Sequence, residues 1–160
     1  MHWRMPRVNI SDPSFEYESG DPEGFRSGLF RVGGRLGARR TGVSVYELPP
    51  GQAICPYHYE YGEEEWLVVL EGRPSLRTPD GAEQLEPMDL AFFPTGPAGA
   101  HQLRNDSGEH VRILMWSEVV TPTATAYPDS DKVGVWTGDK AEDLMVERSS
   151  NVDYFHGESA

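Results

Sequence analysis

Short apolar segments alternate with turn residues through the middle of the chain, from about residue 25 to residue 119. Most of these segments end at Pro, Gly or Asp, and none shows a sustained helical period. Many short strands separated by turns are typical of an all-β sandwich or barrel. The pattern predicts strands within the ranges 41–48, 65–71, 75–77, 83–86, 90–93, 101–105 and 110–119.

The two ends of the chain have a different pattern. Residues 1–40 begin polar and turn-rich, and we expect an extended arm that packs on the barrel or on a neighbour. In residues 120–160 the pattern predicts a strand over 132–136 and a short helical turn over 139–147. Spread aromatic residues favour a tail that packs, either within the chain or only in a dimer. The expected organisation is thus one domain over 1–160, with its barrel core at about 41–119.

Charge and cysteine content narrow the function. The chain has 26 acidic and 14 basic residues, a net charge of −12, which disfavours nucleic acid and anionic membrane surfaces as partners. The apolar run Trp66–Leu70 is too short to span a bilayer, and the N-terminus shows no signal peptide. The single cysteine, Cys55, forbids an internal disulfide and a multi-cysteine zinc site. These features predict a cytoplasmic protein.

The segment 57–65 carries the first candidate chemistry. His58 and Glu60 are two residues apart, so on a strand both side chains project from one face. Three tyrosines then occupy the other face, where we expect packing or dimer contacts: Tyr57, Tyr59 and Tyr61. Glu65 follows a turn at Gly62, and a hairpin there would return Glu65 to the side of His58. A slip of one residue would put Glu64 in its place.

His101, at the head of a later strand, completes a candidate metal site. Two imidazoles and one carboxylate, from His58, Glu60 and His101, would leave coordination positions open, with Glu65 as a fourth ligand. Such a set suits Fe(II), and also Mn, Co, Ni or Zn. Each histidine alone has an ordinary structural interpretation, and Glu60 could be a surface carboxylate. A buried, unpaired Glu60 would cost several kcal/mol, and a bound cation removes that cost.

These residues resemble the two motifs of the cupin superfamily. The first, G-x(5)-H-x-H-x(3,4)-E-x(6)-G, is similar to the segment from Gly51 to Gly72, and the spacing from Glu65 to Gly72 fits. The second ends in H-x(3)-N, which matches His101 and Asn105. The sequence departs from the motifs in three ways: one extra residue before His58, Glu60 in place of the second histidine, and a longer proline–glycine turn before His101. The blocks 58–72, 93–101 and 127–130 also resemble a subgroup of small bacterial cupins.

The resemblance implies a jelly-roll barrel, also called a double-stranded β-helix, with one divalent metal ion inside and a homodimer outside. It leaves the function open, because cupins include oxygenases, isomerases, lyases and plain binding modules. One hypothesis is a metal-dependent enzyme acting on a small organic molecule. The others are a non-catalytic module that binds a small ligand, and a metal-free structural dimer.

Three further expectations concern packing. The barrel interior should be lined by apolar side chains, in a register that the sequence leaves open: Val43, Val45, Leu67, Val69, Phe92 and Leu103. Asn105 is interpreted as a turn or network residue rather than a ligand. Cys55 is interpreted as a small buried residue rather than a catalytic thiol.

Overall fold

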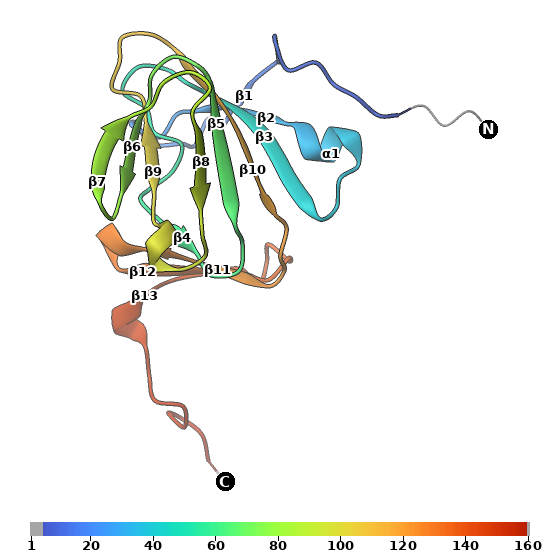
Figure 1. The fold of residues 1–160 in the computed structure, drawn as a ribbon. Helices are drawn as coiled ribbons and strands as arrows, with labels where there is room; N and C mark the ends of the chain where they lie inside the picture. Colours follow the sequence, from blue (N-terminus) through green and yellow to red (C-terminus); the bar gives the residue numbers. More distant parts are fainter. Residues whose placement is uncertain (1–4, 160) are drawn as a thin grey trace, which may run out of the picture.

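The computed structural model describes residues 5–159, and these are mostly strands that are joined by turns (Figure 1). The strands are β1 (Glu16–Tyr17), β2 (Gly28–Arg31), β3 (Thr41–Leu48), β4 (Tyr59–Glu60), β5 (Glu65–Glu71), β6 (Ser75–Thr78), β7 (Gly81–Gln84), β8 (Leu90–Phe93), β9 (Gln102–Arg104), β10 (Val111–Glu118), β11 (Thr123–Tyr127), β12 (Lys132–Trp136) and β13 (Leu144–Glu147). The helical elements are α1 (Val32–Leu36) and three 3₁₀ turns at Pro97–Gly99, Pro128–Ser130 and Arg148–Ser150.

The strands form three antiparallel sheets, and together these make up the barrel. The largest has the order β1-β2-β3-β10-β5-β8, and the others are β7-β6-β9 and β13-β12-β11-β4. Figure 1 shows β6, β7 and β9 on one side, β5, β8 and β10 beside them, and β11–β13 closing one end. The prediction of an all-β jelly-roll fold is confirmed.

Alternation along the strands places the core inside the barrel. Leu67 and Val69 on β5 and Ile113 on β10 are fully buried in one apolar cluster, which also includes Leu103. The predicted inward positions on β3 are wrong by one residue. Leu48 belongs to this cluster and Tyr46 packs against it, whereas Val43 and Val45 pack outside the sheet with β2 and α1.

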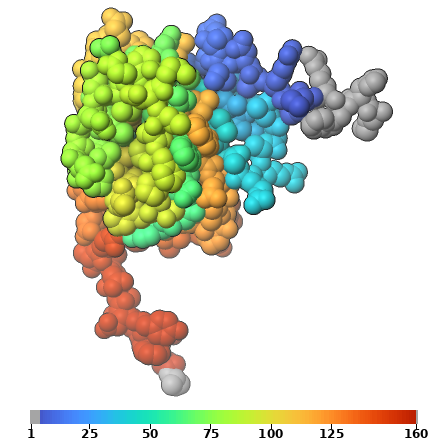
Figure 2. All heavy atoms as spheres, in the orientation of Figure 1, coloured from blue at the N-terminus to red at the C-terminus, as the bar shows by residue number. Residues whose placement is uncertain are grey.

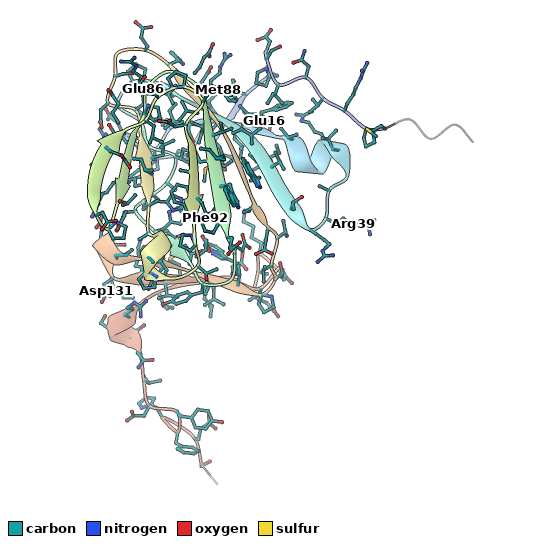
Figure 3. The ribbon with its side chains drawn as sticks, viewed as in Figure 1. Glu16, Arg39, Glu86, Met88, Phe92 and Asp131 are labelled. Atoms are coloured by element: carbon teal, nitrogen blue, oxygen red, sulfur yellow. The ribbon has the colours of Figure 1, made fainter. Side chains whose placement is uncertain are left out.

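Phe92 was also expected inside and instead lies on the outer face of β8, with 43% of its surface exposed (Figure 3). It pairs with Trp66 of β5, which pairs in turn with Trp116 of β10. The ring centroids of Phe92 and Trp66 are 4.5 Å apart, and those of Trp66 and Trp116 are 5.8 Å apart. Aromatic contacts therefore continue across the outside of three neighbouring strands.

The predicted N-terminal arm is part of the largest sheet. β2 pairs with β3, and β1 pairs with β2, so this segment extends the sheet that carries part of the cavity described below. Val8, Ile10 and Phe15 pack against the apolar cluster on the outer face. The sequence did not predict the five-residue helix α1, and residues 1–4 of the arm lie outside the described residues.

The C-terminal segment differs from its prediction in two respects. The strand over 132–136 is confirmed as β12, but the helical turn over 139–147 is wrong, because Leu144–Glu147 pairs with β12 as β13. Tyr154 and Phe155 are 89% and 76% exposed, so the last turns do not pack on the barrel. Figures 1 and 2 show this segment running away from the barrel. Across residues 5–159, no helix has both the length and the apolar character that crossing a bilayer would require.

Asn105 fastens the turn between β9 and β10, as its interpretation as a network residue expected. Its side-chain amide donates to the carbonyl oxygens of Leu48 and Glu109, at 2.7 Å each. Its side-chain oxygen accepts bonds from the amide and the hydroxyl group of Ser107, at 3.0 and 2.6 Å. The side chain is fully buried, so water cannot replace these partners.

We expect Asn105→Ala to lower the free energy of unfolding by about 2–4 kcal/mol, because it removes the hydrogen bonds of a fully buried amide, including its donation to the Leu48 carbonyl. Urea denaturation followed by circular dichroism measures the change. Asn151→Ala, at an exposed position near the C-terminus, is the control and should change stability little. Equal effects of the two substitutions would contradict the role assigned to Asn105.

Candidate metal centre

Two main-chain hydrogen bonds join the loop before β4 to the loop before β9. The amide of His58 donates to the carbonyl of His101 at 3.1 Å, and the amide of His101 donates to the carbonyl of His58 at 2.8 Å. The two imidazole rings consequently lie side by side, with centroids 4.6 Å apart. His101 also stacks on Phe93 of β8, with a centroid separation of 3.7 Å.

The hairpin expected between residues 58 and 65 is wrong. β4 pairs with β11, and Glu65 pairs across β5 with Phe93 and Ser117. Glu65 nevertheless reaches His58, because one side chain points into the barrel from β5 and the other from the loop before β4. Glu64 is exposed, so Glu65 is the glutamate that faces the histidines.

Each histidine is held in one tautomer by a main-chain carbonyl. His58 Nδ1 is 3.0 Å from the carbonyl oxygen of Pro56, and His101 Nδ1 is 2.9 Å from that of Gly99. In this assignment Nδ1–H donates in both rings, which leaves a lone pair on each Nε2. His101 Nε2 is buried and has no hydrogen-bond partner among the described residues. A buried imidazole nitrogen with a free lone pair is suited to bind a metal ion.

Both lone pairs face the carboxylate of Glu65. One Glu65 oxygen lies 3.8 Å from His58 Nε2 and 3.7 Å from His101 Nε2. Each of the three residues offers a ligand atom, and these atoms all lie within 4.8 Å of one another. Donor atoms around one tetrahedral ion at about 2.1 Å are roughly 3.4 Å apart, so the spacing is close to that of a mononuclear site. The donor set suits a divalent transition metal, and the identity of the metal is left open by it.

Glu60 lies beside this group of three but is not part of it. Its Oε1 atom is 3.8 Å from His58 Nε2, which agrees with the expected shared strand face. The Thr125 hydroxyl on β11 donates to the Glu60 carboxylate, at 2.7 and 2.9 Å from its two oxygens. The Thr125 oxygen accepts a bond from the indole of Trp136 at 2.7 Å, so its own proton is free to point to Glu60. Glu60 as a ligand stays a prediction.

Burial shifts the ionisation of all four side chains toward neutral forms. It raises the pKa of Glu65 to about 7, helped by the nearby charges of Glu60 and Glu63. It also raises the pKa of Glu60 to about 7, against the effect of the Thr125 hydrogen bond. Burial, with repulsion from His58, lowers the pKa of His101 to about 3, and burial lowers that of His58. A cation would reverse the carboxylate shifts, because it favours ionised carboxylates and neutral imidazoles.

A cavity of about 400 Å³ opens beside the candidate ligands. His58 and Glu65 line it, together with Ser44 and Tyr46 of β3 and Met115 of β10. Cys55 also lines it, and burial raises the pKa of its thiol to about 12, which keeps it protonated and unreactive. Thr125 and Tyr46 were not predicted as part of the site. A one-residue shift in the assumed alternation of β3 would have placed Tyr46 inside, whereas nothing in the sequence signals Thr125.

Comparison with known proteins agrees with this architecture. Residues 44–117 match the cupin domain family. A provisionally named sugar phosphate isomerase from Acidithiobacillus ferrooxidans superposes with a TM-score of 0.81 at 24% identity, covering 90% of this chain and 91% of that chain. A cupin-superfamily sugar phosphate isomerase from Silicibacter pomeroyi gives 0.78 at 23%, covering 91% and 95%. The polyketide cyclase RemF from Streptomyces resistomycificus gives 0.61 at 25%, covering 75% and 84%.

Residues 44–117 thus match a cupin domain, and the structural neighbours share the fold of the whole barrel. Members of this class can hold a metal ion inside the barrel, and the group formed by His58, Glu65 and His101 is suited to one.

Gly99 sets the position of His101, because its carbonyl accepts the His101 Nδ1–H bond. A Cβ atom at Gly99 would overlap the carbonyl group of Pro94. We expect Gly99→Ala to lower the free energy of unfolding by about 1–3 kcal/mol, since the turn must open to admit the methyl group. Thermal denaturation measures the loss. Ala98→Ser, at an exposed position of the same turn, is the control, and a loss of the same size there would contradict the explanation.

Proposed function

We propose that this protein is a metal-dependent enzyme that acts on a small organic molecule, with His58, Glu60, Glu65 and His101 as the ligands of one divalent ion. The observation that carries the proposal is the pair of Nε2 lone pairs directed at one carboxylate, with His101 Nε2 buried and unpartnered among the described residues. Two carboxylates would balance the charge of a divalent ion. Fe, Mn, Ni and Zn are all compatible with this donor set.

When bound, such an ion polarises a carbonyl or hydroxyl group of the substrate. The protein contributes the positioning and the proton transfer. Glu65 is within the group of three, whereas Glu60 is held at its edge by Thr125, so Glu60 is the carboxylate that can exchange between the ion and a proton. A carboxyl group whose pKa is raised toward neutrality is suited to general acid–base catalysis. This combination supports isomerisation or elimination next to a carbonyl group.

The names of the structural neighbours support the same range of chemistry. They include sugar phosphate isomerases, a polyketide cyclase and a predicted oxalate decarboxylase from Thermotoga maritima. The alternative proposal is a non-catalytic module that binds a small ligand in the same cavity. Turnover of a bound compound separates the enzyme from the module, and metal analysis separates both from a metal-free structural dimer.

The homodimer and the cytoplasmic location also stay predictions. The outer face of β8 supports self-association, because Leu90 and Phe92 are 58% and 43% exposed there beside Trp66. No charged side chain interrupts the paired positions Phe92, Trp66 and Trp116.

We expect His101→Ala to lower the metal content per chain by more than half while the fold remains intact. The substitution removes one of two imidazole donors and leaves the main-chain bridge in place. Mass spectrometry of protein purified without added metal measures the content, and circular dichroism checks the fold. His110→Ala removes an exposed histidine and is the control. Unchanged metal content in His101→Ala would refute the assignment.

We expect Glu60→Gln to weaken metal binding by at least tenfold, because a neutral amide replaces a charged donor. Competition with a fluorescent chelator measures the dissociation constant. Glu64→Gln makes the same change on an exposed neighbour and should leave the constant within twofold. Equal constants for the two variants would show that Glu60 does not contact the ion.

A further inference from the structure

The cavity beside the candidate ligands is lined by hydroxyl groups and lacks positive charge. Among the residues that the structure describes, neither lysine nor arginine lines it. The neutral polar groups along it include the side chains of Ser27, Ser44 and Tyr46. Leu29, Ile54 and Met115 supply its apolar surface. This mixture of hydroxyl groups and apolar surface matches a molecule that carries hydroxyl groups on a carbon chain.

Tyr46 is the most distinctive polar group of the cavity. It lies on β3 between the fully buried side chain of Leu48 and the hydroxyl of Ser44, which share its face of the strand. Within residues 5–159, its hydroxyl group makes no hydrogen bond to another side chain or to the main chain. Burial raises the pKa of Tyr46 to about 12, so the group is a donor at neutral pH. A tyrosine hydroxyl that has no protein partner, on a side chain that lines a cavity, is suited to donate a hydrogen bond to a ligand oxygen.

The charges around the cavity disfavour an anionic ligand. Three acidic residues line its outer part: Glu16, Glu18 and Asp21. Three arginines lie beside that part but do not line the cavity. Arg26 Nε donates to the main-chain carbonyl of Asp21 at 3.4 Å, and the guanidinium groups of Arg31 and Arg35 are 3.9 and 3.6 Å from the carboxylate of Glu16 (labelled in Figure 3). At the inner end, the carboxylates of Glu60 and Glu65 would balance the charge of the proposed divalent ion. A phosphate inside the cavity would therefore lose its hydration, and no lysine or arginine among the lining residues would contact it.

We propose that the cavity accepts a small, uncharged molecule that carries hydroxyl and carbonyl groups, and that it rejects the phosphorylated or carboxylated form of the same compound. The inference rests on the proposed function for the inner end of the cavity, where the ion would meet the carbonyl oxygen. Tyr46 donates a hydrogen bond to a second ligand oxygen, and Ser44 lies close enough along the same strand face to contact the next one.

This substrate class differs from the one in the names of the two structural neighbours that are called sugar phosphate isomerases. Those proteins are 24% and 23% identical to this chain, so the likeness shows a common barrel and leaves the ligand to the local residues. A site for a phosphate group would present arginine, lysine or main-chain amides to its oxygens. The cavity lining supplies carboxylates and hydroxyl groups instead.

Isothermal titration calorimetry of the manganese-loaded full chain tests the proposal with matched pairs of compounds. The neutral probes are dihydroxyacetone and D-fructose, and the anionic probes are dihydroxyacetone phosphate, D-fructose 6-phosphate and gluconate. We expect at least one neutral ketose to bind at least tenfold more tightly than its phosphate and than gluconate. Equal or tighter binding of the phosphates, or no binding of either neutral ketose, would overturn the proposal.

Variants locate the binding in this cavity. Tyr46→Phe should weaken ketose binding about fivefold to tenfold and leave the metal content unchanged, which is the expected cost of one hydrogen bond. Tyr154→Phe, in the exposed C-terminal segment, is the matched control. Met115→Lys places a cation in the cavity and should improve binding of D-fructose 6-phosphate at least tenfold. If neither cavity variant changes binding, the ketose binds elsewhere and the proposal fails.

The same titrations on metal-free protein separate this inference from the proposed function. If the chain binds no metal but still prefers the neutral ketose, the metal site fails and the cavity assignment stands. If the chain binds metal through His101 but prefers the phosphate, the metal site stands and the cavity assignment fails.

Discussion

Two hydrogen bonds between the main chains of His58 and His101 hold the candidate site together. The residues are 43 positions apart in the sequence, and each precedes a short strand of a different sheet. The bridge fixes the separation of the two rings, while the carbonyls of Pro56 and Gly99 fix their rotation and tautomers. The Nε2 atom of each ring, which would face the metal ion, takes no part in holding the ring in place. The loops are thus preorganised by the backbone, and Glu65 adds its carboxylate from a third element, β5.

The barrel places four ionisable side chains in an interior that disfavours their charges. Leu67, Val69 and Leu103 belong to the apolar core of the barrel, and burial in this interior shifts the pKa values of the carboxylates and imidazoles toward their neutral forms. Thr125 and Trp136 offset part of the cost for Glu60 by supplying hydrogen bonds from the neighbouring sheet. The open side of the group faces the cavity, where Tyr46 supplies a neutral donor. The polar side chains of the barrel interior thus lie together beside the cavity, next to the apolar core.

Much of this arrangement could be predicted from local pattern. The strands 41–48, 65–71 and 132–136 were correct because alternation and flanking turn residues define them locally. The histidines and Glu65 were found from spacing, but the reason given for their approach was wrong: β4 pairs with β11 rather than with β5. Local pattern does not reveal which strands pair, because the pairing depends on contacts between residues that are distant in the sequence. The hydrogen bond from Thr125 to Glu60 is one such contact. The face of β3 was misjudged since both of its faces are covered, one by the barrel core and the other by α1 and the N-terminal residues Val8 and Ile10.

Arg148 marks where the barrel ends toward the C-terminus. Its guanidinium group donates to the hydroxyl of Tyr61 at 2.8 Å and lies 3.7 Å from a carboxylate oxygen of Asp131. The described residues that follow it are exposed, and none of them lines the cavity beside the histidines. A dye, an affinity tag or a surface tether attached after this arginine would therefore report on the protein or immobilise it without touching the chemistry within.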